Sequence, residues 1–87
     1  METRVAVMSI IVESPDSVAA INDLLHNHSA YIIGRMGIPY REKNISIISI
    51  AIDAPQNVTA ALSGKIGRLP GVSVKTAYSG VTGGADE

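Results

Sequence analysis

The chain has 87 residues, no cysteine, and 7 basic against 8 acidic side chains, which gives a net charge of −1. Without cysteine it forms neither disulfides nor zinc–thiolate sites, and its balanced charge provides no general attraction to nucleic acid or anionic membranes. The start of the chain does not have the form of a signal peptide, and no apolar run approaches the roughly 20 residues that span a bilayer. We therefore expect one cytoplasmic domain, marginally stable as a monomer because so short a chain buries only about 60% of its unfolded surface.

Residues 4–13 predict the first strand. Apolar residues occupy both of its faces, which is typical of a central strand that is covered on both sides. A helix is expected next, with Ser14 as its N-terminal cap, Pro15 in its first turn and an end near Asn27. The buried stripe of this helix consists of Val18, Ile21, Leu24 and Leu25.

The second predicted strand covers residues 30–38 and is followed by Pro39. Proline lacks the N–H that a sheet ladder needs, so it favours the end of a strand or the edge of a sheet. Strand alternation divides the residues of this segment between two faces. One face is expected to hold Ala30, Ile32, Gly34, Met36 and Ile38, and the other Tyr31, Ile33, Arg35 and Gly37.

The second half of the chain repeats this pattern. Residues 45–52 predict a third strand, and a second helix is expected from Pro55 to about Arg68. Its buried stripe consists of Val58, Ala61, Leu62 and Ile66. Residues 72–78 predict the fourth strand, and residues 79–87, which are glycine-rich and end in acidic residues, are expected to form a disordered tail.

The predicted order of elements is βαββαβ. This order is typical of an α+β, ferredoxin-like domain, in which a four-stranded antiparallel sheet carries two helices on one face. The first and third strands are central in this fold, and they are also the most apolar strands predicted here. We therefore expect a single domain over residues 1–78.

Two helices cover only one face of such a sheet, and the other face is expected to be apolar too. Its predicted residues are Val5, Val7, Ile11, Ile45 and Ile47. Exposed apolar patches of this kind mark interaction surfaces. We therefore expect a homo-oligomer, either a dimer or a tetramer; the alternative is that a loop or the tail covers part of this face.

Three runs of sequence resemble a known bacterial family: residues 31–40 (YIIGRMGIPY), residues 45–52 (ISIISIAI) and residues 62–75 (LSGKIGRLPGVSVK). The family is assigned to the regulation of the iron-only hydrogenase system, and the resemblance covers roughly residues 3 to 78. It implies an ACT-like fold, similar to the C-terminal domain of nickel-responsive repressors. It also implies a stand-alone domain that senses a small-molecule effector or binds a protein partner.

The sequence departs from these related domains at two places. ACT domains that bind amino acids carry a glycine in the turn after the first strand, whereas this chain has Glu13-Ser14-Pro15-Asp16 there. Nickel repressors use histidines and a cysteine, and no cysteine is present. No ribbon-helix-helix segment precedes the domain, so we predict no direct reader of nucleic acid.

Gly34, Arg35, Met36 and Gly37 are the main candidates for a ligand or interface site. In a functional interpretation the glycines let a ligand approach the backbone, and the planar Arg35 guanidinium grips a carboxylate or phosphate. In a structural interpretation the glycines mark a bulged edge strand and make room for a neighbouring helix, while Arg35 forms an interface salt bridge.

The two histidines, His26 and His28, are weak candidates for a metal site. They are two residues apart on a helix, so they do not face the same way, and histidine is ordinary at a helix C-terminus. No catalytic constellation or cofactor motif emerges, so we predict a non-enzyme without a cofactor. Two hypotheses remain: a ligand-sensing regulatory oligomer, and a structural interaction module that binds another protein without a small ligand.

Overall fold

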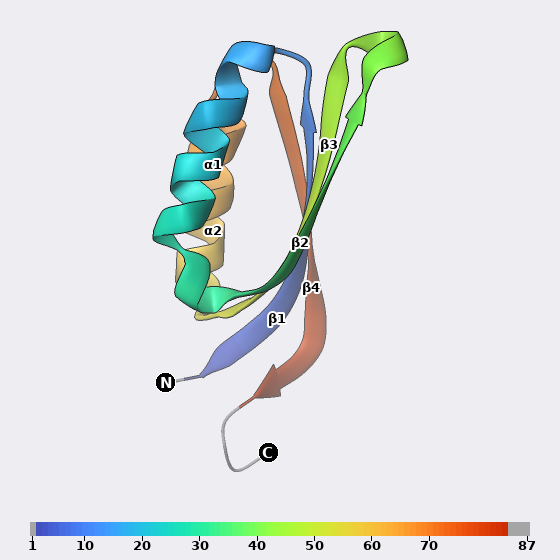
Figure 1. Ribbon diagram of the computed structural model, residues 1–87. Helices are drawn as coiled ribbons and strands as arrows, with labels where there is room; N and C mark the ends of the chain where they lie inside the picture. The colour runs from blue at the N-terminus through green and yellow to red at the C-terminus, as the bar shows by residue number, and fades with distance from the viewer. Residues whose placement is uncertain (1, 84–87) are drawn as a thin grey trace.

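The computed structural model describes residues 2–83 and confirms the predicted βαββαβ order (Figure 1). The elements are β1 (Thr3–Val12), α1 (Val18–Asn27), β2 (Ile32–Tyr40), β3 (Ile45–Ala54), α2 (Gln56–Gly67) and β4 (Val72–Gly83). All four strands pair antiparallel in the order β2-β3-β1-β4, so β1 and β3 are central as predicted. Both helices lie on one face of the sheet, which confirms the ferredoxin-like, ACT-like architecture.

The hydrophobic core lies between this face and the helices. Alternate residues of β1 and β3 point into it and are buried, among them Met8, Ile10 and Ile50. Helix α1 contributes Ile21 and Leu25, with Val18 and Leu24 packed at the rim as predicted. In α2 the buried residues are Thr59, Leu62 and Ile66, whereas Ala61, which the predicted stripe included, is exposed.

Several predicted boundaries are wrong. Strand β2 covers residues 32–40 rather than 30–38, because Ala30 and Tyr31 lie in a 3₁₀ turn at Ser29–Tyr31. Strand β4 continues to Gly83, because residues beyond 78 still find partners on β1, including the pair Thr3 and Gly83. Residues 79–83 are therefore strand rather than tail, and residues 84–87 of the predicted tail lie outside the described residues. The Ser14 side chain makes no capping hydrogen bond, and a short 3₁₀ turn at Pro15–Ser17 leads into α1 instead.

A β-bulge in β2 changes which residues share a face. The ladder with β3 pairs Ile32 with Ile52 and then Gly34 with Ala51, so Ile33 is an extra residue between two ladder positions. Ile32 consequently packs against the core on the helix side, opposite to Gly34, Met36 and Ile38. The prediction that these four residues share one face is wrong, because strand alternation restarts after the bulge.

None of the helices in the described part of the chain is long and apolar enough to cross a membrane.

Candidate functional site

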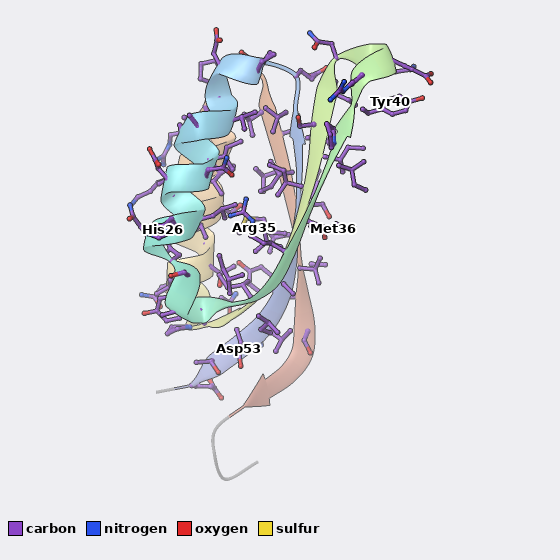
Figure 2. The ribbon with its side chains drawn as sticks, in the orientation of Figure 1. His26, Arg35, Met36, Tyr40 and Asp53 are labelled. Atoms are coloured by element: carbon purple, nitrogen blue, oxygen red, sulfur yellow. The ribbon has the colours of Figure 1, made fainter. Side chains whose placement is uncertain are left out.

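Strand β2 divides the four candidate residues of its central segment between two surfaces. Arg35 and Gly37 pair with Ile50 and Ile48, which are buried under the helices, so they lie on the helix side of the sheet. Gly34 and Met36 pair with Ala51 and Ser49 on the opposite side. Figure 2 shows Arg35 on the side of β2 that faces α1. The candidates therefore do not form one site, although the structure confirms that β2 is an edge strand.

On the helix side, β2 borders a groove. Two hollows, of about 150 and 240 Å³, lie between α1 and the hairpin formed by β2 and β3. Both are lined by Val18, Pro39 and Ser46, so they adjoin, and we refer to them together as the α1–β2 groove. All of β2 after Ile32 is exposed, so the helices leave this part of the edge strand uncovered. The remaining lining residues are Val12, Pro15, Asn22, Arg35, Gly37, Ile38, Tyr40, Arg41, Asn44, Ile45 and Ile48.

Arg35 is held in this groove by a contact with α1. Its Nη2 donates a hydrogen bond of 2.8 Å to Oδ1 of Asn22. The bond uses one donor of the guanidinium and orients the rest of its planar fork, which remains available to an anion. Because the Asn22 oxygen accepts this bond, the amide nitrogen of Asn22 is also left as a donor.

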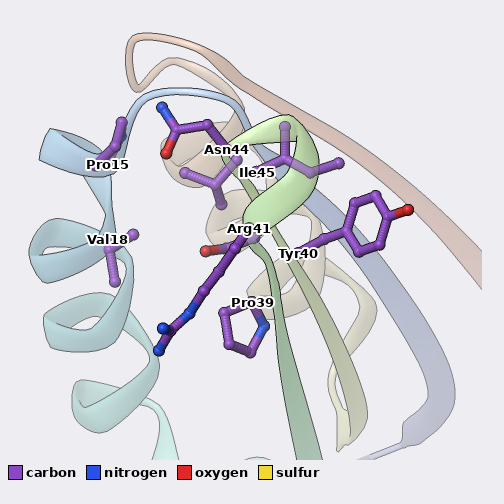
Figure 3. Close-up of a pocket in the computed structure, with 9 residues that line it drawn as sticks. Pro15, Val18, Pro39, Tyr40, Arg41, Asn44 and Ile45 are labelled. Carbon is purple, nitrogen blue, oxygen red and sulfur yellow. The ribbon is translucent and has the colours of Figure 1, made fainter.

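A second arginine reaches the groove from the hairpin turn. Arg41 begins the short 3₁₀ turn at Arg41–Lys43, which closes through Asn44 in the left-handed conformation at φ 55°. Figure 3 shows its side chain extended along the groove toward α1. Within residues 2–83 the Arg41 guanidinium has no hydrogen-bond or ion-pair partner. Across the same range, no acidic side chain lines either hollow.

The two glycines of β2 do not make room for another part of this chain. A Cβ atom placed on Gly34 or Gly37 meets no atom within 4 Å. Both residues also have ordinary backbone angles, since Gly71 is the one glycine with positive φ among the described residues. The structural interpretation that they admit a neighbouring helix is therefore wrong. At Gly37 the missing side chain leaves the α1–β2 groove open.

The face of the sheet that lacks helices, called here the open face, is mainly apolar. Val5, Val7, Ile11 and Ile47 are between 38% and 45% exposed, and Ile45 is half-buried. Strand β2 adds Met36, Ile38 and Tyr40. Three rows of neighbours cross this face: Ile38–Ile47–Ile11–Ser73, Met36–Ser49–Ser9–Lys75 and Gly34–Ala51–Val7–Ala77. Lys75 is the one charged residue in these rows.

The two histidines lie at the end of α1 and do not converge. His28 Nδ1 is 2.8 Å from the Leu24 carbonyl oxygen, which can only accept, so this nitrogen carries the proton. His26 is exposed. In the part of the chain that the structure describes, no three histidine or acidic side chains gather in a geometry that could hold a metal ion.

Asn22 and Arg41 were not among the residues predicted for the candidate site. A signal for Arg41 was present, because Arg35, Gly37, Pro39 and Arg41 are two residues apart and an extended strand places them on one face. The prediction ended the strand at residue 38, before this alternation reached Arg41. Asn22 carried no signal, since its role depends on where α1 packs relative to β2.

Comparisons with known proteins agree with this architecture. The model of the TM1266-like family, described as "Iron-only hydrogenase system regulator, putative", matches residues 4–76. The solved structure of the uncharacterized protein TM1266 from Thermotoga maritima is 38% identical, with a TM-score of 0.84, and the match covers 87% of this chain and 96% of that one. No curated protein matches the chain significantly.

Two other solved structures, each 11% identical, share the fold alone. The C-terminal domain of the MgtC protein from Mycobacterium tuberculosis has a TM-score of 0.71, with 87% of both chains covered. A formyltetrahydrofolate deformylase from Pseudomonas putida KT2440 has a TM-score of 0.63; the match covers 84% of this chain but 28% of the enzyme.

Proposed function

Because the chain belongs to the TM1266-like family of iron-only hydrogenase system regulators, we propose that it is a ligand-responsive regulatory domain of that system. It works as a homo-oligomer and binds a small ligand in the α1–β2 groove. The observation that carries this proposal is the groove itself, which stays open beside a closed core and whose charged lining consists of two arginines.

The open face supports the oligomer. A second copy of the chain presents the same apolar residues, so two sheets can pack face to face at the usual separation of about 10 Å. A domain of this size gains the apolar burial that it lacks as a monomer. The second copy is therefore the occupant that we assign to this face, in a dimer or tetramer.

Strand β2 connects the two surfaces. Arg35 and Gly37 line the groove, while Met36 lies between them on the open face. Ile38 pairs with Ile47 on the open face and also contributes to the lining of the groove. A ligand that draws β2 toward α1 shifts Met36 and Ile38 at the same time, because alternate residues of one strand move together. Ligand binding and assembly are coupled in this way, and the coupling is the regulatory output that we propose.

A thermal-shift screen tests the ligand. The whole chain is screened against amino acids, nucleotides, organic acids and divalent metals, and at least one compound is expected to raise the melting temperature. Gly37→Val fills the groove and should abolish that shift, because its added atoms enter the open space above Gly37. Gly80→Val is the matched control, since it adds the same side chain to β4, at the opposite edge of the sheet from the groove, where a Cβ atom also meets nothing within 4 Å; it should keep the shift.

The second candidate function is a structural interaction module without a small ligand. The apolar open face favours it, because such a face also suits a different protein. This candidate predicts that no compound shifts the melting temperature and that a protein partner co-purifies with the chain through the open face. A ligand shift that Gly37→Val removes is incompatible with it.

A further inference from the structure

The charge of the α1–β2 groove points to the class of its ligand. We propose that the ligand is a small organic dianion, with two acidic groups joined by a short apolar segment. This inference rests on the proposed function, which makes the groove a ligand site, and it adds which chemistry the groove selects. Arg35 binds one acidic group and Arg41 binds the other.

The charged side chains that line the groove are all positive. The whole chain carries a net charge of −1, yet the described charged residues that line the groove are Arg35 and Arg41. Both guanidinium groups are exposed and line adjoining hollows without a carboxylate, so a ligand with two negative charges can pair with both of them. A ligand with one charge leaves one arginine unpaired.

The groove is divided into two hollows, and each contains one of the arginines. Arg41 lines the hollow beside the hairpin turn, and Arg35 lines the hollow beside the middle of α1. Val18, Pro39 and Ser46 line both hollows, so the surface that the hollows share is mainly apolar and carries one hydroxyl group. An apolar segment of the ligand fits this central region, while its ends reach the two guanidinium groups.

Neutral hydrogen-bonding groups accompany the two arginines in the groove. Asn22 orients the Arg35 fork and keeps its own amide N–H groups free, and Ser46 and Asn44 add neutral polar groups to the lining. Carboxylates and phosphates accept bonds from guanidinium groups in pairs, which gives both affinity and orientation. The two acidic groups can therefore be carboxylates or phosphates, since the groove offers the same chemistry to both.

Calorimetric titration of the whole chain tests this proposal. The probes are linear dicarboxylates from succinate to suberate, monocarboxylates and neutral diamides of the same lengths, and alkane bisphosphonates. One chain length of the dianions should bind at least about tenfold more tightly than its monocarboxylate, the effect of one added charge-assisted hydrogen bond. The affinities for dicarboxylates and bisphosphonates are then compared, and they show whether the groove prefers carboxylate or phosphate-like groups.

Charge-removing variants test the two arginines. Arg35→Gln and Arg41→Gln should each weaken binding of the dianion about 10- to 100-fold, to the level of the monocarboxylate. Lys43→Gln removes the same charge from the same turn as Arg41, and Arg68→Gln removes one beyond α2; neither residue lines the groove, so both should bind normally.

Several outcomes would overturn the inference. Equal affinity for mono- and dicarboxylates, or an Arg41→Gln variant that binds normally, excludes a two-anion ligand but leaves a ligand site at Arg35. A neutral compound whose binding is blocked by Gly37→Val also excludes the dianion, although the proposed function survives. If no compound of any class binds the groove, the ligand part of the proposed function fails together with the inference.

Discussion

Gly71 joins two loops at one end of the sheet. It has φ of +69°, and its carbonyl oxygen accepts a hydrogen bond of 2.7 Å from the Glu13 N–H. A Cβ atom at this position would lie 2.8 Å from Cβ and 2.9 Å from N of Ser14. Both the backbone conformation and the close approach of Ser14 therefore require glycine here.

Gly71→Ala should lower the free energy of unfolding. The left-handed conformation costs an alanine about 1–2 kcal/mol, and the contact with the Ser14 backbone adds to this. Urea denaturation at a fixed protein concentration measures the loss. Gly64→Ala is the control, because its Cβ meets an ordinary 3.8 Å contact with Nη2 of Arg68, the residue after α2, and alanine stabilises a helix by up to about 1 kcal/mol. A Gly71→Ala variant as stable as the parent chain would contradict the turn described here.

A buried serine also connects these two loops, the one before α1 and the one after α2. Ser17, which is 4% exposed and precedes α1, donates a hydrogen bond of 2.7 Å from Oγ to the Pro70 carbonyl oxygen. The bond connects the start of α1 to the turn between α2 and β4. Pro15 in the same segment lines the α1–β2 groove, so this contact also holds one end of the groove in place.

Ser17→Ala should cost about 1–2 kcal/mol, because it leaves the part-buried Pro70 carbonyl without its partner. Amide hydrogen exchange should also become faster around residues 14–18, since the start of α1 loses its connection to the opposite turn. Ser29→Ala changes an exposed serine at the other end of α1 and should stay within about 0.5 kcal/mol of the parent chain. Unchanged exchange in Ser17→Ala would show that other contacts hold this loop.

Strand β2 is the element that relates the two proposed surfaces. Its bulge after Ile32 lets that residue join the core, while Ile33 is 63% exposed. After the bulge the strand alternates between the groove and the open face, with Arg35 and Met36 as neighbours on opposite sides. One side of this strand can therefore contact a ligand in the groove while its other side contacts a second copy of the chain.

At the scale of the molecule, the open face is the surface through which we propose that the chain assembles. Ile47 lies in the row Ile38–Ile47–Ile11 and is expected to be buried when two sheets pack together. Sedimentation should show an oligomer at micromolar concentration, and Ile47→Lys should convert it to monomer, because an unpaired charge in an apolar interface is costly. In the monomer Ile47 is 38% exposed, so the lysine can reach solvent and the variant should keep its circular dichroism spectrum.

Ala61→Lys is the control for this experiment. It places the same charge on the exposed side of α2, away from the open face, and should remain an oligomer. A parent chain that sediments as a monomer would remove the oligomer from the proposed function, whatever the variants do.

Much of this architecture follows from local patterns. Alternation along residues 4–13 and 45–52 predicted the faces of the central strands, because a strand places side chains on its two sides with a period of two. The apolar spacing of α1 predicted its buried stripe for the same kind of reason. These features need no knowledge of distant contacts, so the order of the elements, the fold and the exposed apolar face could all be predicted.

The α1–β2 groove depends on contacts between segments that are distant in the sequence. Pairing with β3 sets the bulge after Ile32 and thereby turns Gly37 toward the helices, and the packing of α1 brings Asn22 to Arg35. Continuation of β2 through Pro39 adds Arg41 to the same side. Local residue patterns indicated that residues 34–37 were unusual, but a period of two cannot reveal a bulge or the position of a helix. The register of the folded sheet and the packing of α1 assign Arg35 and Gly37 to the α1–β2 groove, and Gly34 and Met36 to the open face.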